Sequence, residues 1–162
     1  MNHMNWDDYF MNVAILSAER SKDPNTKVGA VIVNEDKRIV GIGYNGFPNG
    51  CSDLDFPWAR EGAYEDTKYA YVVHAEENAI LNSTHSLKEA SIYVSLFPCN
   101  ECAKKIIQSG IREIVYLSDK YNGTATDIAS KRMLKASGVK TRQLSMEKTI
   151  RVREEQKSEV QN

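Results

Sequence analysis

Residues 74–118 read HAEENAILNSTHSLKEASIYVSLFPCNECAKKIIQSGIREIVYLS, and this stretch decides the fold. Its apolar residues change from helical spacing to short β-rich runs and back again. With the residues that follow it, the stretch predicts, in order, a helix over 74–83, a strand over 91–97, a helix over 99–109, a strand over 113–118, a helix over 126–137 and a strand over 139–144. Such alternation indicates crossover units, so we expect at least three parallel strands.

Upstream of this stretch, the sequence predicts a helix followed by a hairpin. Asn5 can cap a helix over 6–20, which ends before Pro24 because proline disfavours helical geometry at the residue before it. Two β-rich runs follow at 28–33 and 38–44, and the polar turn between them predicts an antiparallel pair. The complete pattern is that of an α/β protein with a mixed five-stranded sheet and helices on both faces, a three-layer αβα architecture.

Two segments lie outside this pattern. Residues 45–73 combine glycines, prolines and aromatic residues without a sustained period, and a connection this long inside a compact domain is usually functional or disordered. The aromatic content favours an ordered, functional segment. Residues 147–162 are rich in charged residues and glutamine, so we expect a weakly held helix or a disordered tail. Residues 1–146 then form the single domain.

Composition excludes several classes of protein. The chain has 162 residues, 41% of them hydrophobic and 27% charged, which suits one globular domain. A net charge of −1 lacks the basic excess of a domain that binds nucleic acid. Residues 1–10 lack the basic and apolar character of a secretory signal, and no run approaches the roughly 18 apolar residues of a membrane span. We therefore expect a cytoplasmic protein without nucleic-acid or membrane partners.

Three cysteines without an export signal favour reduced thiols, and two of them lie in a pattern that suits a metal. Cys99 and Cys102 fall on one turn at the start of a predicted helix, where exposed amides favour thiolates. His74 begins another predicted helix and supplies a third ligand of the type that Zn²⁺ prefers. Three protein ligands leave a corner for water, whose pKa zinc lowers towards ~7. Glu76, two residues from His74, is placed to shuttle protons without binding the metal.

Two other interpretations of these cysteines remain. A structural zinc site needs a fourth ligand, for which Cys51, His3 and His85 are the remaining candidates. A redox pair would also use Cys-x-x-Cys, but it would leave the His74-x-Glu76 group unexplained. We therefore prefer one catalytic zinc ion per chain.

The order H-x-E…P-C-x-x-C is the signature of zinc-dependent nucleobase deaminases. Beyond it, the sequence resembles the deoxycytidylate deaminase branch of the cytidine deaminase superfamily over roughly residues 6–145. The resemblance is carried by Asp23-Pro-Asn-Thr-Lys-Val-Gly-Ala, Gly43-Tyr-Asn-Gly-Phe-Pro-Asn-Gly-Cys-Ser-Asp, Asp66-Thr-Lys-Tyr, His74-Ala-Glu-Glu-Asn-Ala-Ile, Leu96-Phe-Pro-Cys-Asn-Glu-Cys-Ala-Lys and Ser118-Asp-Lys-Tyr. It implies a cytidine-deaminase-like fold.

The resemblance also implies an activity, the hydrolysis of dCMP to dUMP and ammonia, which supplies dUMP for dTMP synthesis. Water activated by zinc attacks C4 of the base while Glu76 relays a proton to N3 and then to the leaving amine. Asn45 matches the family asparagine that holds the sugar hydroxyl, although Asn-Gly also suits a plain turn. Lys27, Lys120 and Tyr121 are candidates for the 5′-phosphate, and each fits a solvated loop residue equally well.

Relatives are commonly hexamers, activated by dCTP and inhibited by dTTP, with Mg²⁺ accompanying the triphosphate. The residues that match their glycine-rich effector loop are Gly43, Tyr44, Gly46, Asn49 and Gly50. The same loop could serve the catalytic site with no regulatory role. Some phage relatives carry a second, structural zinc in this region, but here Cys51 stands alone and is expected to be a buried small residue.

Three other functions share parts of this pattern. A deaminase of another cytosine nucleotide or of tRNA would use the same His74, Glu76, Cys99 and Cys102, but a tRNA enzyme would be expected to carry a basic stripe. A non-catalytic zinc module for assembly or nucleotide sensing would not need Glu76. The presence of the glutamate therefore favours an enzyme.

Overall fold

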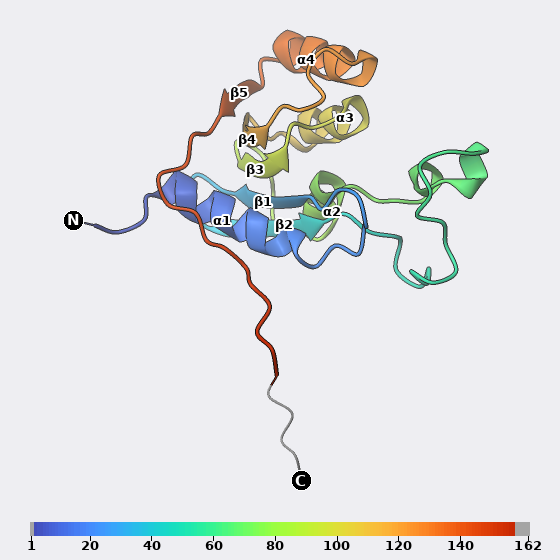
Figure 1. Cartoon of the computed structure of the whole chain (residues 1–162). Coiled ribbons are helices and arrows are strands. Elements are labelled where there is room, and N and C mark those ends of the chain that lie inside the picture. Colours follow the sequence, from blue (N-terminus) through green and yellow to red (C-terminus); the bar gives the residue numbers. More distant parts are fainter. Residues whose placement is uncertain (1, 158–162) are drawn as a thin grey trace.

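A computed structural model describes residues 2–157 of the chain (Figure 1). In chain order the elements are α1 (Trp6–Ala18), β1 (Gly29–Val33), β2 (Ile39–Tyr44), the short 3-10 helices η1 (Tyr64–Asp66) and η2 (Lys68–Ala70), α2 (Ala75–Leu81), β3 (Ser91–Leu96), α3 (Asn100–Ser109), β4 (Glu113–Ser118), α4 (Ala125–Ser137) and β5 (Lys140–Gln143). Every expected helix and strand before Met146 is present. The largest differences in their ends occur at α1 and α2, which both stop two residues early.

The five strands form one mixed sheet in the order β2-β1-β3-β4-β5. β1 pairs antiparallel with both β2 and β3, whereas β3, β4 and β5 run parallel. The expected hairpin and the three parallel strands are therefore confirmed. Every residue of the second strand in this order, β1, is buried, as expected for a strand covered on both faces.

Helices cover both faces of the sheet and give the predicted three layers (Figure 1). On one face, α1 packs Phe10 and Met11 against alternate residues of β1, β3 and β4. On the other face, α2, α3 and α4 contribute Ala79, Ile106 and Leu134 to the larger core. Burial of these two apolar layers is the main force that holds the sheet between its helices.

Local sequence explains where the helices begin and end. The side chain of Asn5 accepts a hydrogen bond of 2.8 Å from the amide of Asp8, which is the predicted cap of α1. α3 and α4 both stop at glycines in the left-handed conformation, Gly110 and Gly138. The residues immediately before α2 and α3 are His74 and Cys99, so both helices begin at an expected metal ligand.

Close packing between β2 and α2 depends on Gly43. A Cβ atom at this position would collide with the backbones of Ala75 and Ala79 in α2. The missing side chain therefore lets the first turn of α2 lie directly on the strand. That turn carries Glu76 and follows His74, so the contact helps to position the expected chemical groups.

Residues 47–72 form an excursion whose two ends are joined. Gly46 and Val73 exchange backbone hydrogen bonds of 3.1 and 2.8 Å and close its base. Inside it, the ring centres of Phe47 and Trp58 lie 4.1 Å apart, so the aromatic residues form a small cluster of their own. This agrees with the prediction of an ordered segment.

After β5 the chain crosses α1 as an extended strap (Figure 1). The buried carboxylate of Asp8 accepts hydrogen bonds from the amides of Glu147 and Lys148, and Asn12 bonds to Lys148 and Ile150. Residues 147–157 contain no helix, which was one of the two forms expected for the tail, and 158–162 lie outside the described residues. No helix within residues 2–157 has the length and apolar character needed to cross a bilayer.

Candidate functional site

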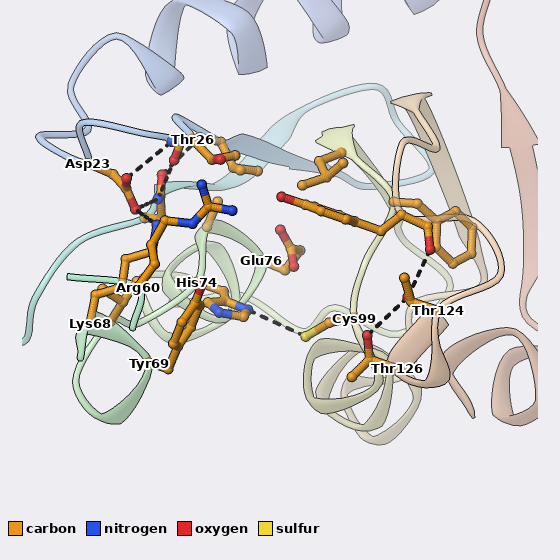
Figure 2. A pocket seen from close by; sticks show the side chains of 17 residues that line it. Asp23, Thr26, Arg60, Lys68, Tyr69, His74, Glu76, Cys99, Thr124 and Thr126 are labelled. Atoms are coloured by element: carbon orange, nitrogen blue, oxygen red, sulfur yellow. Dashed lines mark hydrogen bonds and ion pairs between the residues drawn. The ribbon is translucent and has the colours of Figure 1, made fainter. Parts of the chain in front are cut away.

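Three possible metal ligands meet where the first turns of α2 and α3 face each other. Nδ1 of His74 lies 3.5 Å from Sγ of Cys99 and 3.3 Å from Sγ of Cys102. The three ligand atoms all lie within 4.8 Å of one another, and Figure 2 shows the first of these contacts at the edge of a pocket. Three groups that are separated by up to 28 residues along the chain are therefore gathered around one point.

The protonation of this group suits metal binding. Hydrogen bonds with Cys102 and then with His74 lower the pKa of Cys99 to about 4. The hydrogen bond with Cys99 raises the pKa of His74 to about 9. A hydrogen bond with Cys99 also raises the pKa of Cys102. The lowered pKa of Cys99 favours the thiolate, which is the form in which cysteine binds a metal.

The donor set fits zinc. One imidazole nitrogen and two sulfurs are the ligand types that Zn²⁺ prefers, and three protein ligands are typical of catalytic sites. Cys51, His3 and His85, the possible fourth ligands, do not join the group within residues 2–157. Cys51 is half-buried and not buried as expected, because it lies in the excursion and outside the core. The arrangement thus lacks the fourth protein ligand of a structural site.

Glu76 lies beside these ligands and faces the same pocket (Figure 2). Its side chain is buried, with only 4% of the residue exposed, and burial raises the pKa of its carboxyl group. A carboxyl group with a raised pKa keeps its proton to higher pH than an exposed one and can pass it on. This is the position that a proton shuttle requires.

The pocket is a cavity of about 360 Å³ that opens beside the metal ligands. Five parts of the chain line it: the loop before β1, Asn45 with the excursion after β2, His74 with the first turn of α2, the segment of Leu96, Phe97 and Cys99, and the start of α4 with the loop before it. Its volume lies within the range usual for small-molecule sites. A small ligand held here would touch both Glu76 and Cys99.

Comparison with known proteins decides the family. The model for the cytidine and deoxycytidylate deaminase zinc-binding region matches residues 4–118. The chain belongs to this family. It is therefore a hydrolytic deaminase, and His74, Cys99 and Cys102 lie within the matched zinc-binding region.

Relatives in this deaminase family include human deoxycytidylate deaminase, which is 55% identical over 140 residues, covering 85% of this chain and 79% of the human protein. A probable deoxycytidylate deaminase of Drosophila melanogaster is 56% identical over 158 residues, covering 93% and 78% of the two chains. Among solved structures, the dCMP deaminase of cyanophage S-TIM5 in complex with dCMP and dUMP has a TM-score of 0.69 at 25% identity. That match covers 88% of this chain and all of the phage chain.

Asn45 of the deaminase lines the pocket, but its amide is largely used by the protein. Its nitrogen donates to the carbonyl of Thr26 at 2.9 Å and lies 3.5 Å from a carboxylate oxygen of Asp23. Its oxygen accepts from the amide of Val28 at 2.8 Å. One lone pair of this oxygen is left to accept from a ligand hydroxyl, and Asn45 also shapes the loop before β1.

The expected phosphate ligands divide into two groups. Tyr121 lines the pocket, whereas Lys27 and Lys120, both exposed and both described by the structure, do not. The ammonium of Lys120 lies 5.1 Å from the centre of the Tyr121 ring, so this lysine lies beside the pocket-lining tyrosine. Lys27 lies between two residues of the cavity wall, Thr26 and Val28, but is not itself part of that wall.

Sequence reasoning missed two cations of the excursion. Arg60 points into the pocket between Asp23 and Glu76, and Lys68 reaches the buried carboxylate of Asp23 at 2.6 Å (Figure 2). The length of segment 45–73 signalled a functional loop. Its sequence has no period that distinguishes a cation facing the pocket from one facing solvent.

The residues that match the effector loop surround the base of the excursion. Gly43 is buried under α2, Tyr44 ends β2, and Gly46 pairs with Val73. Asn49 and Gly50 are exposed, and Gly50 has a left-handed φ of 87°. Gly43 therefore has a packing role that the sequence did not reveal, and an effector site in this loop stays a prediction.

Proposed function

We propose that this deaminase hydrolyses dCMP to dUMP and ammonia. The observation that carries the proposal is the buried Glu76 beside His74, Cys99 and Cys102, all at one nucleotide-sized cavity. The names of relatives at 55–56% identity and the phage enzyme in complex with dCMP and dUMP support this substrate. The site is thus proposed to act on a cytosine monophosphate.

His74, Cys99 and Cys102 would hold the zinc ion. When bound, zinc supplies a water of lowered pKa next to the base. The carboxylate of Glu76 would take a proton from a water molecule as the oxygen of that water bonds to C4, and would give the proton to N3 of the ring. Glu76 would then take the remaining proton from the new hydroxyl on C4 and pass it to the amino nitrogen, so that the bond from C4 to that nitrogen breaks and ammonia leaves with a carbonyl at C4.

Burial of Glu76 serves both proton transfers. An exposed carboxyl group is ionised at neutral pH and carries no proton for N3, whereas the raised pKa of the buried Glu76 favours the protonated form that donates to the ring. The neighbouring imidazole and thiols are the expected metal ligands, so Glu76 is the acid–base group of the site.

Arg60 is the proposed ligand of the 5′-phosphate. Its guanidinium lines the pocket, and no carboxylate of residues 2–157 forms an ion pair with it. Lys68, the other cation of the pocket, is already paired with Asp23. A planar guanidinium binds phosphate through two parallel hydrogen bonds, and the hydroxyl of Tyr121 could add another. Arg60 thus replaces Lys27 in our assignment.

Substrate comparison tests this function. Product analysis with dCMP, deoxycytidine, dCTP and a tRNA oligonucleotide should give dUMP from dCMP at the highest kcat/KM. Deoxycytidine should be far poorer, because it leaves phosphate ligands unpaired. Equal kcat/KM for deoxycytidine and dCMP would contradict a monophosphate site. Faster release of ammonia from tRNA than from dCMP would make tRNA the substrate in place of dCMP.

The wider role rests on the resemblance alone. We propose a cytoplasmic homo-oligomer, a hexamer by analogy, that supplies dUMP for dTMP synthesis and responds to dCTP with Mg²⁺ and to dTTP. A triphosphate bound between subunits would favour one state of the assembly and make the dCMP curve sigmoidal. Saturation curves with each triphosphate, paired with light scattering, test this. A monomer with an unchanged hyperbolic curve would contradict it.

A further inference from the structure

Lys131, on the second turn of α4, gathers the loop that precedes its own helix. Its ammonium lies 3.0 and 3.2 Å from the two carboxylate oxygens of Asp119 and 2.8 Å from the amide oxygen of Asn122. It also lies 3.0 Å from a carboxylate oxygen of Asp127, whose side chain is buried. The ammonium of Lys131 therefore joins three residues: Asp119 before residues 120–121, and Asn122 and Asp127 after them.

The loop held in this way forms a wall of the pocket. Tyr121, Thr124 and Thr126 line the cavity, and the hydroxyl of Thr124 donates to the carbonyl of Tyr121 at 2.8 Å. The amide of Gly123 donates to Asp127 at 2.9 Å. Lys131 itself does not line the pocket, so it acts on a ligand indirectly, through the pocket residues that it holds and through its charge.

The same part of α4 is fastened to the metal side of the pocket. The hydroxyl of Ser130, which is fully buried, donates to the carbonyl of Pro98 at 2.8 Å, directly before the expected ligand Cys99. The ammonium of Lys131 lies 4.8 Å from the ring centre of Phe97, another residue of the pocket wall. α4 therefore connects the loop of Tyr121 to the segment that presents Cys99.

Charge gives Lys131 a second effect. Without it, the carboxylates of Asp119 and Asp127 would lie beside a pocket loop with no cation between them. Both negative charges would disfavour an anionic ligand, and like-charge repulsion would open the loop. Lys131 therefore holds the loop in place and also neutralises the carboxylates of Asp119 and Asp127.

We propose that Lys131 is a positioning residue that holds the 119–124 loop in the shape needed to bind the monophosphate substrate. The inference rests on the proposed function and extends it to a residue outside the pocket. It predicts that loss of the ammonium weakens binding of dCMP more than it slows the chemical step. Binding of deoxycytidine, which carries no negative charge, changes less.

The test compares Lys131→Met with Lys131→Arg and with Lys135→Met, a matched control that removes an exposed lysine one turn further along α4. In Lys131→Met the KM for dCMP should rise by about tenfold or more, as expected for lost hydrogen bonds to charged groups, with kcat within about threefold. Lys131→Arg should restore most of the affinity, and Lys135→Met should behave as the wild type. Zinc content should be the same in all four proteins.

Hydrogen exchange at the amides of residues 119–124 gives a readout that does not need turnover. Exchange should be faster in Lys131→Met than in the wild type and Lys135→Met. An unchanged KM for dCMP, or an equal rise in Lys135→Met, would overturn the inference, as would unchanged exchange. A wild-type protein inactive on dCMP would instead contradict the proposed function, and the exchange comparison would still test the hold of Lys131 on the loop.

Discussion

The ammonium of Lys68 lies 2.6 Å from a carboxylate oxygen of Asp23, and both side chains are buried. Lys68 belongs to the excursion after β2, and Asp23 belongs to the loop before β1. The same carboxylate accepts hydrogen bonds from the amides of Asn25 and Thr26. Although burial acts to raise the pKa of Asp23, the ion pair with Lys68 and these two hydrogen bonds hold it below its usual value. The pair therefore fixes two walls of the pocket to each other.

Lys68→Met should lower the free energy of unfolding by about 3–5 kcal/mol, because it leaves a buried carboxylate without its partner. Urea unfolding at neutral pH measures the change. Lys22→Met is the matched control, since Lys22 pairs with Asp53 across the same two segments but is mostly exposed. That variant should lose about 1 kcal/mol or less. Similar losses in the two variants would contradict the role assigned to the buried pair.

The purified wild-type protein should contain one zinc ion per chain. Replacing both Cys99 and Cys102 by alanine removes two of three ligands and should abolish zinc binding in metal analysis. Cys51→Ala is the control, because this thiol lies outside the ligand group. Two zinc ions per chain, or loss of zinc from Cys51→Ala, would refute the assignment.

Arg60→Ala should reduce kcat/KM for dCMP by about ten- to a hundredfold, because a charged hydrogen-bond donor to phosphate is lost. The kcat/KM for deoxycytidine should change little, since that substrate has no phosphate. Arg132→Ala removes an exposed arginine of α4 that does not line the pocket, and it should leave both values unchanged. If Arg60→Ala lowers kcat/KM for dCMP and for deoxycytidine by the same factor, Arg60 does not bind the phosphate.

Asp8→Ala tests the strap that crosses α1. It leaves the amides of Glu147 and Lys148 without their acceptor, and it should cost about 1–3 kcal/mol in urea unfolding. In a chain shortened to residues 1–146 these amides are gone, so the same substitution should cost much less. The difference between the two backgrounds is the coupling energy of Asp8 with the strap. Equal costs would show that Asp8 stabilises α1 in another way.

Local signals made the fold and the centre of the site predictable. Asn5, Gly110 and Gly138 mark helix ends through the conformations they favour, and the change between helical and β-rich spacing gave the order of elements. The sequence could bring His74 and Cys99 together because their two helices flank one strand: His74 begins the helix before β3, and Cys99 begins the helix after it. The family motif then supplied the role of Glu76.

Contacts between distant residues could not be predicted in the same way. Lys68 and Asp23 are 45 residues apart, and Lys148 lies 136 residues from Asn12, so no local period links them. Lys27 was expected at the pocket because it is a cation in a family motif, yet it is exposed and its neighbours Thr26 and Val28 line the cavity instead. Arg60 lies in an aperiodic loop, and only the folded excursion points it at the cavity.

The central claim is that Glu76 beside a zinc ion held by His74, Cys99 and Cys102 deaminates dCMP. The most direct test measures dUMP and ammonia formed from dCMP by the wild type and by Glu76→Gln, with zinc content determined for both. The amide keeps the size of the side chain but cannot shuttle protons. We predict equal zinc in both proteins, equimolar dUMP and ammonia from the wild type, and a loss of at least about 10²–10⁴-fold in the variant. A zinc-loaded wild type that forms no dUMP, or a variant with a near wild-type rate, would contradict the account.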